Sequence, residues 1–227
     1  MSTTPGERRT VVIDETHQVS ALFDRPQSAR AALVLAHGAG AGMEHASMQS
    51  LASGLAERGI AVLRYQFPYM ERKSRRTDPP ALCHATVRAA VREAARLAPD
   101  LPLIAGGRSF GGRMTSQAQA QSPLPQVRGL AFFAFPLHPA GQPGSDRAAH
   151  LFSVDIPMLF IQGTRDELAE LGLLGALVGQ LGTRATLHLL QNADHSFHVP
   201  ARSGRKDPQV REELLDLVSQ WVESLIA

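Results

Sequence analysis

Apolar residues gather in short, nearly continuous runs, and these alternate with longer stretches in which apolar positions recur at helical spacing. Apolar runs without strict alternation are typical of strands that are buried on both faces, as in a parallel sheet covered by helices. The pattern predicts strands at 11–13, 19–23, 31–36, 60–65, 101–105, 127–135, 156–162 and 185–190. The first two are expected to pair antiparallel across the short connection at 15–18.

The stretches between these strands predict helices. In the first of them, Met48, Leu51 and Leu55 lie nearly on one side. Helices are predicted at 47–58, 82–97, 167–181 and 209–226, with one more that opens at 112–115. Strands that alternate with helices give right-handed crossovers and a mostly parallel sheet. We therefore expect an α/β fold with about seven to eight strands and helices on both faces.

Length and composition fit one domain over residues 1–227, since 44% of the residues are hydrophobic, enough for a buried sheet. No apolar run approaches a membrane span, and the polar residues 1–9 lack the apolar core of a signal peptide. The single cysteine, Cys83, excludes an internal disulfide and favours a cytoplasmic location. A net charge of +2 is too small to indicate nucleic-acid binding. No His, Cys and Asp residues have metal-ligand spacing, so neither a metal nor an organic cofactor is expected.

The most informative motif is Gly107-Arg108-Ser109-Phe110-Gly111, which follows an apolar run and precedes a segment that can open a helix. A serine on a tight strand-to-helix turn leaves almost no room for side chains two positions away, so glycine is needed on both sides. The backbone N–H of Phe110 would then point at the position where an oxyanion forms. Ser109 is the predicted nucleophile, and a helix N-cap is its structural alternative.

An acid and a histidine follow in the order that a Ser-Asp-His hydrolase requires. Asp166 comes directly after the predicted strand 156–162, and His195 follows the predicted strand 185–190. Glu167 and Asp146 are weaker alternatives for the acid, and His198 is the rival for the base. Asp194 is adjacent to His195 and could hardly turn back to serve as its partner.

A loop of small residues, His-Gly-Ala-Gly-Ala-Gly at 37–42, follows the third predicted strand. This is where a serine hydrolase of this type places its second oxyanion N–H, and small residues let the backbone approach a substrate oxygen. Ala39 is the preferred donor and Gly40 the second choice, beside Phe110. A phosphate-binding loop is the rival interpretation, but no Lys-Ser/Thr pair follows and no dinucleotide fingerprint fits.

With these motifs the chain resembles small α/β-hydrolases of the dienelactone-hydrolase type. It is most similar to the group that includes testis-expressed protein 30 and the third subunit of the non-specific-lethal chromatin complex. The resembling stretches are 37–42, Phe-Pro-Tyr-Met at 67–70, Gly-Arg-Ser-Phe-Gly-Gly-Arg-Met at 107–114, Gln-Gly-Thr-Arg-Asp at 162–166 and Asp-His-Ser at 194–196. The resemblance implies a serine-hydrolase fold over nearly the whole chain. It does not supply a substrate, and it implies that some relatives act as complex subunits.

The proline- and glycine-rich segment 136–155 lies where this fold often inserts a lid, but it allows only a loop with one helical turn near His150. A minimal lid favours a short, soluble substrate, without a membrane or nucleic-acid partner. Tyr69, His138, His150 and His198 are the candidates for substrate contacts, with surface or structural roles as the alternative for the two lid histidines. The oligomeric state stays open.

Basic residues follow several strands at the sheet edge that carries Ser109. They are Arg72, Lys73, Arg75, Arg76, Arg147, Arg165, Arg202, Arg205 and Lys206. Together they would attract an anionic substrate, and solvated arginines paired with nearby acids are the alternative. Arg113 lies in the first turn of the helix after Ser109, where the helix dipole disfavours a cation, and an ion pair is expected there.

The predicted activity is two-step acyl transfer on a small ester or thioester, with Ser109, Asp166 and His195 as the catalytic residues. A non-catalytic interaction module that keeps the hydrolase fold is the alternative class.

Overall fold

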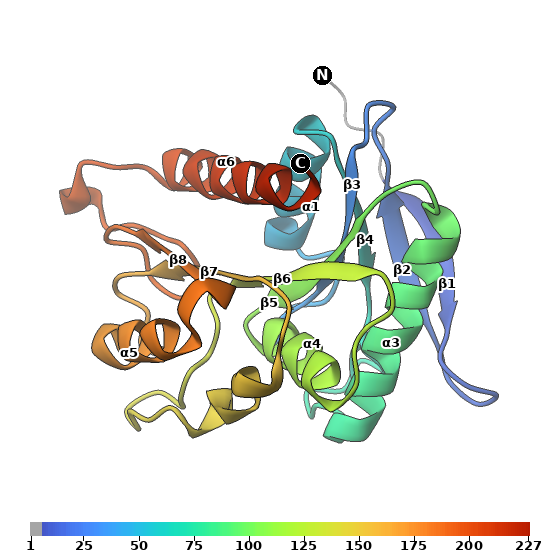
Figure 1. Ribbon diagram of the computed structural model, residues 1–227, viewed down its shortest axis with the longest axis horizontal. Coiled ribbons are helices and arrows are strands. Elements are labelled where there is room, and N and C mark those ends of the chain that lie inside the picture. The colour runs from blue at the N-terminus through green and yellow to red at the C-terminus, as the bar shows by residue number, and fades with distance from the viewer. Residues whose placement is uncertain (1–5) are drawn as a thin grey trace.

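The computed structural model describes residues 6–227, and its centre is one eight-stranded sheet (Figure 1). The strands lie in the order β1-β2-β4-β3-β5-β6-β7-β8. β2 pairs antiparallel with β1 and with β4, and all other neighbours are parallel. Their bounds are β1 Glu7–Val12, β2 Gln18–Asp24, β3 Ala31–Ala36, β4 Ile60–Tyr65, β5 Leu103–Arg108, β6 Val127–Phe133, β7 Met158–Gly163 and β8 Ala185–Leu190. The mostly parallel sheet expected from the sequence is confirmed, and the first five residues of the polar N-terminal stretch lie outside the described part.

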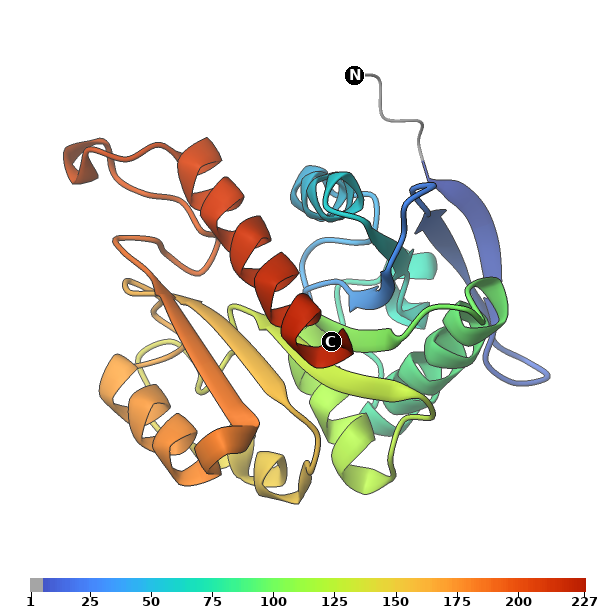
Figure 2. The same ribbon diagram turned by 45° about the horizontal axis from the view of Figure 1, so that its top comes forward.

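Helices cover both faces of the sheet (Figure 2). Their bounds are α1 Ala46–Glu57, α2 Pro68–Glu71, α3 Pro80–Leu97, α4 Phe110–Gln121, α5 Leu171–Leu181 and α6 Asp207–Ile226, with short 3₁₀ helices η1 Asp146–Ser153, η2 Gly182–Arg184 and η3 Ala201–Ser203. α1 and α6 pack on one face, and α3, α4 and α5 pack on the other. In the described residues no helix is long and apolar enough to cross a membrane.

Burial on both faces explains the continuous apolar runs. Along β3, Ala32 and Val34 point into the core under α3 and α4, whereas Leu33 and Leu35 point into the core under α1 and α6. Alternate side chains of a strand face opposite sides, so a central strand with two covered faces must be apolar throughout.

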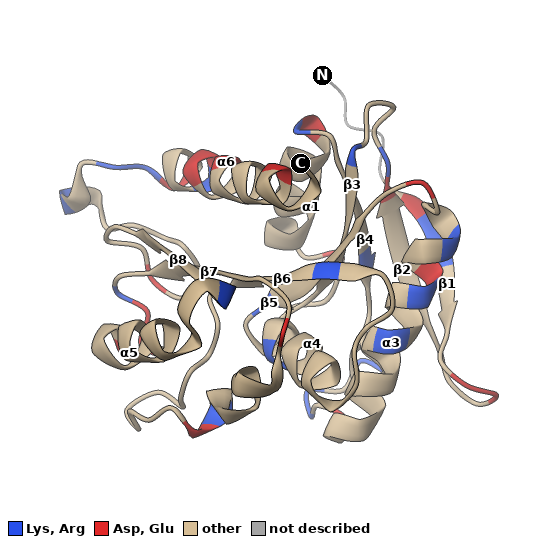
Figure 3. Ribbon diagram, in the orientation of Figure 1, with Lys and Arg blue, Asp and Glu red and all other residues tan. Residues whose placement is uncertain are grey.

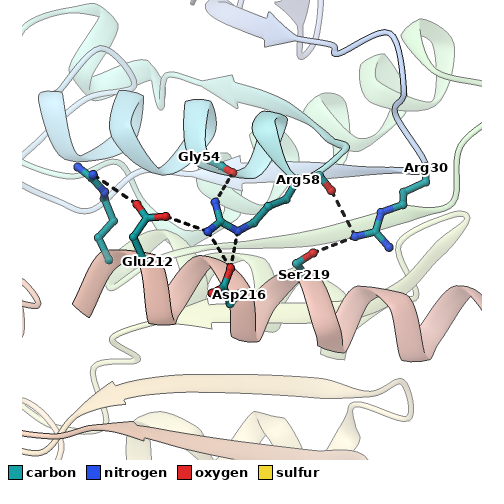
Figure 4. A network of polar contacts seen from close by, with 7 residues as sticks. Arg30, Gly54, Arg58, Glu212, Asp216 and Ser219 are labelled. Atoms are coloured by element: carbon teal, nitrogen blue, oxygen red, sulfur yellow. Dashed lines mark hydrogen bonds and ion pairs between the residues drawn. The ribbon is translucent and has the colours of Figure 1, made fainter. Parts of the chain in front are cut away.

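The two helices of one face are joined by a network of polar contacts around Arg58, at the end of α1 (Figure 4). Its Nε donates to Asp216 Oδ1 at 2.8 Å and its Nη2 to Glu212 Oε2 at 2.9 Å. Arg30 donates from Nη2 to Ser219 Oγ at 2.8 Å and to the Arg58 carbonyl at 3.2 Å. The network fixes α1, which follows the loop 37–42, against α6, which follows the segment that carries His195.

Several predicted boundaries were wrong for local reasons. β6 ends at Phe133 and not at 135, because Ala134 has a positive φ of 57°. α5 begins at Leu171 and not at 167, since the carboxylate of Glu170 accepts the N–H groups of residues 172 and 173 as an N-cap. η1 spans eight residues where one turn was expected, and the single turn α2, which Pro68 opens, was not predicted.

Candidate active site

Ser109 lies on a strained turn between β5 and α4, with φ 49° and ψ −116°. This backbone conformation is unfavourable for a residue other than glycine. It persists only where the surrounding structure enforces it. Its N–H donates to the Phe133 carbonyl at 2.9 Å. A Cβ at Gly107 would lie 2.7 Å from the Ala36 carbonyl oxygen, and one at Gly111 would lie 2.5 Å from the His37 carbonyl oxygen. Both glycines are therefore required by close packing, as the sequence motif indicated.

Ser109, His195 and Asp166 form one chain of hydrogen bonds. Ser109 Oγ lies 2.9 Å from His195 Nε2, and His195 Nδ1 lies 2.7 Å from Asp166 Oδ2. The side chain of Asp166 is fully buried, whereas His195 is 27% exposed. This geometry fits an imidazole that donates its Nδ1 proton to the carboxylate and turns a basic Nε2 towards the hydroxyl.

The Asp166 carboxylate has two further donors. Gln162 donates from Nε2 to Oδ2 at 2.5 Å, and the Leu168 N–H donates to Oδ1 at 2.8 Å. The Gln162 side chain is buried, and its Oε1 has no hydrogen-bond partner among the described residues. The role of Gln162 was not predicted from the sequence. The feature that could have indicated it is an amide side chain inside an otherwise apolar strand, four residues before Asp166. The alternatives Asp146 and Glu167 are exposed, and the acidic partner of His195 is Asp166.

The loop that carries His195 is organised by Asp194, which was not assigned a role from the sequence. Asp194 Oδ1 accepts the N–H groups of Ser196 at 2.7 Å and His198 at 3.0 Å. Arg108 crosses beneath the loop, donating from Nη2 to the His195 carbonyl at 3.3 Å. Burial lowers the pKa of Arg108, against the opposing influence of Asp194 and Asp166. These contacts hold the imidazole in place without binding its reactive nitrogen.

The loop 37–42, the candidate oxyanion loop, lies next to Ser109. A Cβ at Gly38 would be 3.9 Å from Ser109 Cβ. His37 is fully buried, with Nδ1 2.7 Å from the Gly38 carbonyl and Nε2 accepting the Phe67 N–H at 3.0 Å. Burial lowers the pKa of His37 to about 4, so the ring is neutral at pH 7 and donates from Nδ1. His37 thus joins the candidate oxyanion loop to the turn before α2.

Tyr69 was a candidate for substrate contacts, and the structure corrects this. Its side chain is buried, and its hydroxyl donates to the Ala39 carbonyl at 3.0 Å. Because the peptide is planar and trans, the N–H of Gly40 points away from Tyr69. The tyrosine orients the candidate oxyanion loop, while Ala39 and Gly40 both stay candidates for the donor beside Phe110.

The lid histidines make structural contacts in the described residues. His138 is buried, with Nδ1 2.8 Å from the Pro139 carbonyl and Nε2 accepting the Glu170 N–H at 2.8 Å. His150 is half-buried, with Nε2 2.7 Å from Ser116 Oγ. Both rings therefore anchor the lid segment to the helices beneath it.

His198 lies away from the triad. Its Nδ1 is 2.6 Å from Asp207 Oδ2 at the start of α6. It also lines a cavity of about 210 Å³ between the first turns of α1 and α6, whose apolar wall includes Met48, Leu51 and Phe197. Ser109 and His195 are not part of the lining, so this cavity lies beside the candidate triad without containing the candidate nucleophile. His198 is not placed to replace His195 as the base.

Within residues 6–227, no group of three or more His, Cys, Asp or Glu side chains could hold a metal ion.

The sequence profile described as "Alpha/beta hydrolase domain" matches residues 29–223. The chain belongs to this family. Among solved structures, it is similar to dienelactone hydrolase from Anabaena variabilis, with a TM-score of 0.79 and 20% identity over 98% of this chain and 99% of that one. A serine hydrolase homologue from Coxiella burnetii gives a TM-score of 0.75 and 21% identity over 95% and 99% of the two chains.

A third α/β-hydrolase, from Xanthomonas campestris, is described as a serine hydrolase without a lid. It gives a TM-score of 0.74 and 22% identity over 96% of this chain and 95% of that one. At this identity the likeness shows the fold, and the α/β-hydrolase architecture expected from the motifs is confirmed.

Proposed function

We propose that this α/β-hydrolase is a serine hydrolase that cleaves small esters or thioesters. The observation that carries the proposal is the continuous hydrogen-bonded chain from Ser109 through His195 to the buried Asp166. The strained backbone at Ser109 supports it, since such strain is typical of the nucleophile turn in this fold.

In the proposed reaction His195 takes the Ser109 proton at Nε2 while Oγ bonds to the acyl carbon, and the carbonyl π electrons move to the oxygen. The N–H groups of Phe110 and of Ala39 or Gly40 bind this oxyanion. Collapse of the tetrahedral intermediate breaks the bond to the alcohol or thiol, which receives the proton from His195. Water, deprotonated by the same imidazole, then attacks the acyl-enzyme and releases the acid, so that Ser109 regains its proton.

Asp166 supports this cycle because it fixes the Nδ1–H tautomer and stabilises the transient imidazolium. The short lid favours a compact, soluble substrate. The motifs at 107–114 and 162–166 support a place near the group of testis-expressed protein 30. The single cysteine, Cys83, supports a cytoplasmic location.

The proposal is tested with a fluorophosphonate and with p-nitrophenyl acetate. Intact-mass and peptide analysis should find one adduct, on Ser109, and Ser109→Ala should lose both labelling and turnover. Ser116→Ala is the matched control, since this serine of α4 contacts His150 and not the triad. If the folded protein is neither labelled nor active, the non-catalytic module is the better description.

A further inference from the structure

Arg113 lies in the first turn of α4, four residues after Ser109, and is half-buried. Its Nε is fully buried and has no hydrogen-bond partner, and the ion pairs formed by residues 6–227 do not include it. The ion pair expected there from the sequence is therefore not formed. A half-buried cation at the positive end of a helix dipole is unfavourable unless an anion compensates it.

The neighbouring element adds a second cation instead of a counter-ion. η1 packs against α4 (Figures 1 and 2), held by the contact of His150 Nε2 with Ser116 Oγ at 2.7 Å. Arg147 lies three residues before His150 and so on the same side of this 3₁₀ helix, towards α4. Asp146, beside it in sequence, is exposed and forms none of the described ion pairs.

The electrostatics agree with this placement. Burial lowers the pKa of Arg113, and so does the charge of Arg147, whereas Cys83 has the opposite effect. Burial and the charge of Arg113 lower the pKa of His150 to about 4, with His84 acting in the same direction. His150 is therefore neutral at pH 7, and two uncompensated guanidinium groups remain.

Of the two, Arg113 lies close to the candidate oxyanion donor Phe110. The Arg113 guanidinium carbon is 5.9 Å from the centroid of the Phe110 ring, and the Phe110 N–H is a candidate oxyanion donor. Two other cations of the predicted rim have carboxylate partners, since Arg72 pairs with Asp78 and Arg205 with Glu213. Figure 3 shows Lys and Arg spread over separate elements.

We propose that Arg113 and Arg147 form an anion subsite that binds a carboxylate carried by the substrate close to its scissile acyl group. A planar guanidinium matches a carboxylate in a bidentate geometry, and two of them at a half-buried site give charge-assisted hydrogen bonds. The inference rests on the proposed hydrolase function and names its substrate class: half-esters or half-thioesters of small dicarboxylic acids.

The test compares two thioesters of equal length, one ending in a carboxylate and the other in a carboxamide. Wild-type kcat/KM should favour the carboxylate about tenfold or more at low salt, mainly through KM, because charge-assisted hydrogen bonds are stronger than those to a neutral amide. Arg113→Met and Arg147→Met, which keep the apolar length of the side chain, should each reduce this ratio severalfold. Arg75→Met is the matched control, since Arg75 is exposed after β4, and should keep the wild-type ratio.

A binding experiment separates this subsite from the proposed catalysis. Calorimetry on Ser109→Ala should detect glutarate, and the Ser109→Ala/Arg113→Met double variant should lose that binding. Equal kcat/KM for the two thioesters, or glutarate binding that survives Arg113→Met, would overturn the subsite while leaving the hydrolase function standing. Turnover that persists in Ser109→Ala would overturn the function instead.

Discussion

Replacement of His37 by glutamine should make the folding stability less dependent on pH. The imidazole is fully buried between the Gly38 carbonyl and the Phe67 N–H, and its pKa is lowered from an ordinary value of 6.5 to about 4. The folded protein therefore keeps this ring neutral at pH values where the unfolded chain would protonate it. The stabilisation is fully present above pH 6.5 and is lost as the pH falls towards 4.

The magnitude follows from the size of the shift. Each pKa unit corresponds to about 1.4 kcal/mol, so a shift of roughly 2.5 units amounts to about 3 kcal/mol over the whole window. Between pH 6.5 and 5.0 the contribution of His37 should fall by about 2 kcal/mol. In the glutamine variant this loss is absent, although the variant starts less stable at pH 7 because the donor bond to Gly38 is lost or weakened.

Urea unfolding at half-unit steps from pH 7.0 to 4.5 measures the difference directly. Wild type should lose about 2 kcal/mol more than His37→Gln between pH 6.5 and 5.0. His188→Gln, on β8 and only partly buried, is the matched control and should keep the wild-type slope. Identical slopes for wild type and His37→Gln would refute the assignment of a buried neutral imidazole.

Three other substitutions test packing, positioning and charge. Gly111→Ala should lower both stability and kcat, because its Cβ would lie 2.5 Å from the carbonyl oxygen that begins the candidate oxyanion loop; thermal unfolding and esterase assays check this. Gln162→Leu should reduce kcat about tenfold with little change in KM, since Asp166 loses a donor worth about 1.5–3 kcal/mol, and Gln162→Glu should reduce it further. Asp216→Asn should destabilise the fold by about 0.5–1 kcal/mol through its pair with Arg58, and 1 M NaCl should shrink that difference in urea unfolding.

The sheet was predictable because its strands are buried on both faces and therefore carry long apolar runs. β3, β4 and β8 were placed with the bounds that the structure has. The helix starts were less accurate, since they depend on single side-chain contacts. The start of α5 is an example: Glu167 continues the helical composition, but the carboxylate of Glu170 forms the cap. A single capping contact of this kind produces no periodic pattern of apolar residues in the sequence.

The three residues of the candidate triad could be grouped from the sequence because each has a position after a strand, and the topology brings these positions to one edge of the sheet. The supporting contacts were not identifiable, since they join elements far apart in sequence. Arg108 reaches the carbonyl of a residue 87 positions later, and Tyr69 reaches a carbonyl 30 positions earlier. A histidine or tyrosine that serves such a contact looks the same in sequence as one that would bind substrate, which is why the structural contacts of Tyr69 and His138 were not predicted.

Two other largely buried arginines support the anion subsite, because each of them has a carboxylate partner. Arg64, which is 3% exposed, pairs with Asp24 at 3.0 Å, and Arg58, which is 19% exposed, has two carboxylates. For these two arginines the chain supplies carboxylates, which offset the cost of burying a charge. Arg113, four residues after Ser109, departs from that pattern, and the largest charge effect on its pKa comes from another arginine. The described residues supply no carboxylate to Arg113. The carboxylate of a bound substrate is therefore the simplest counter-ion for it.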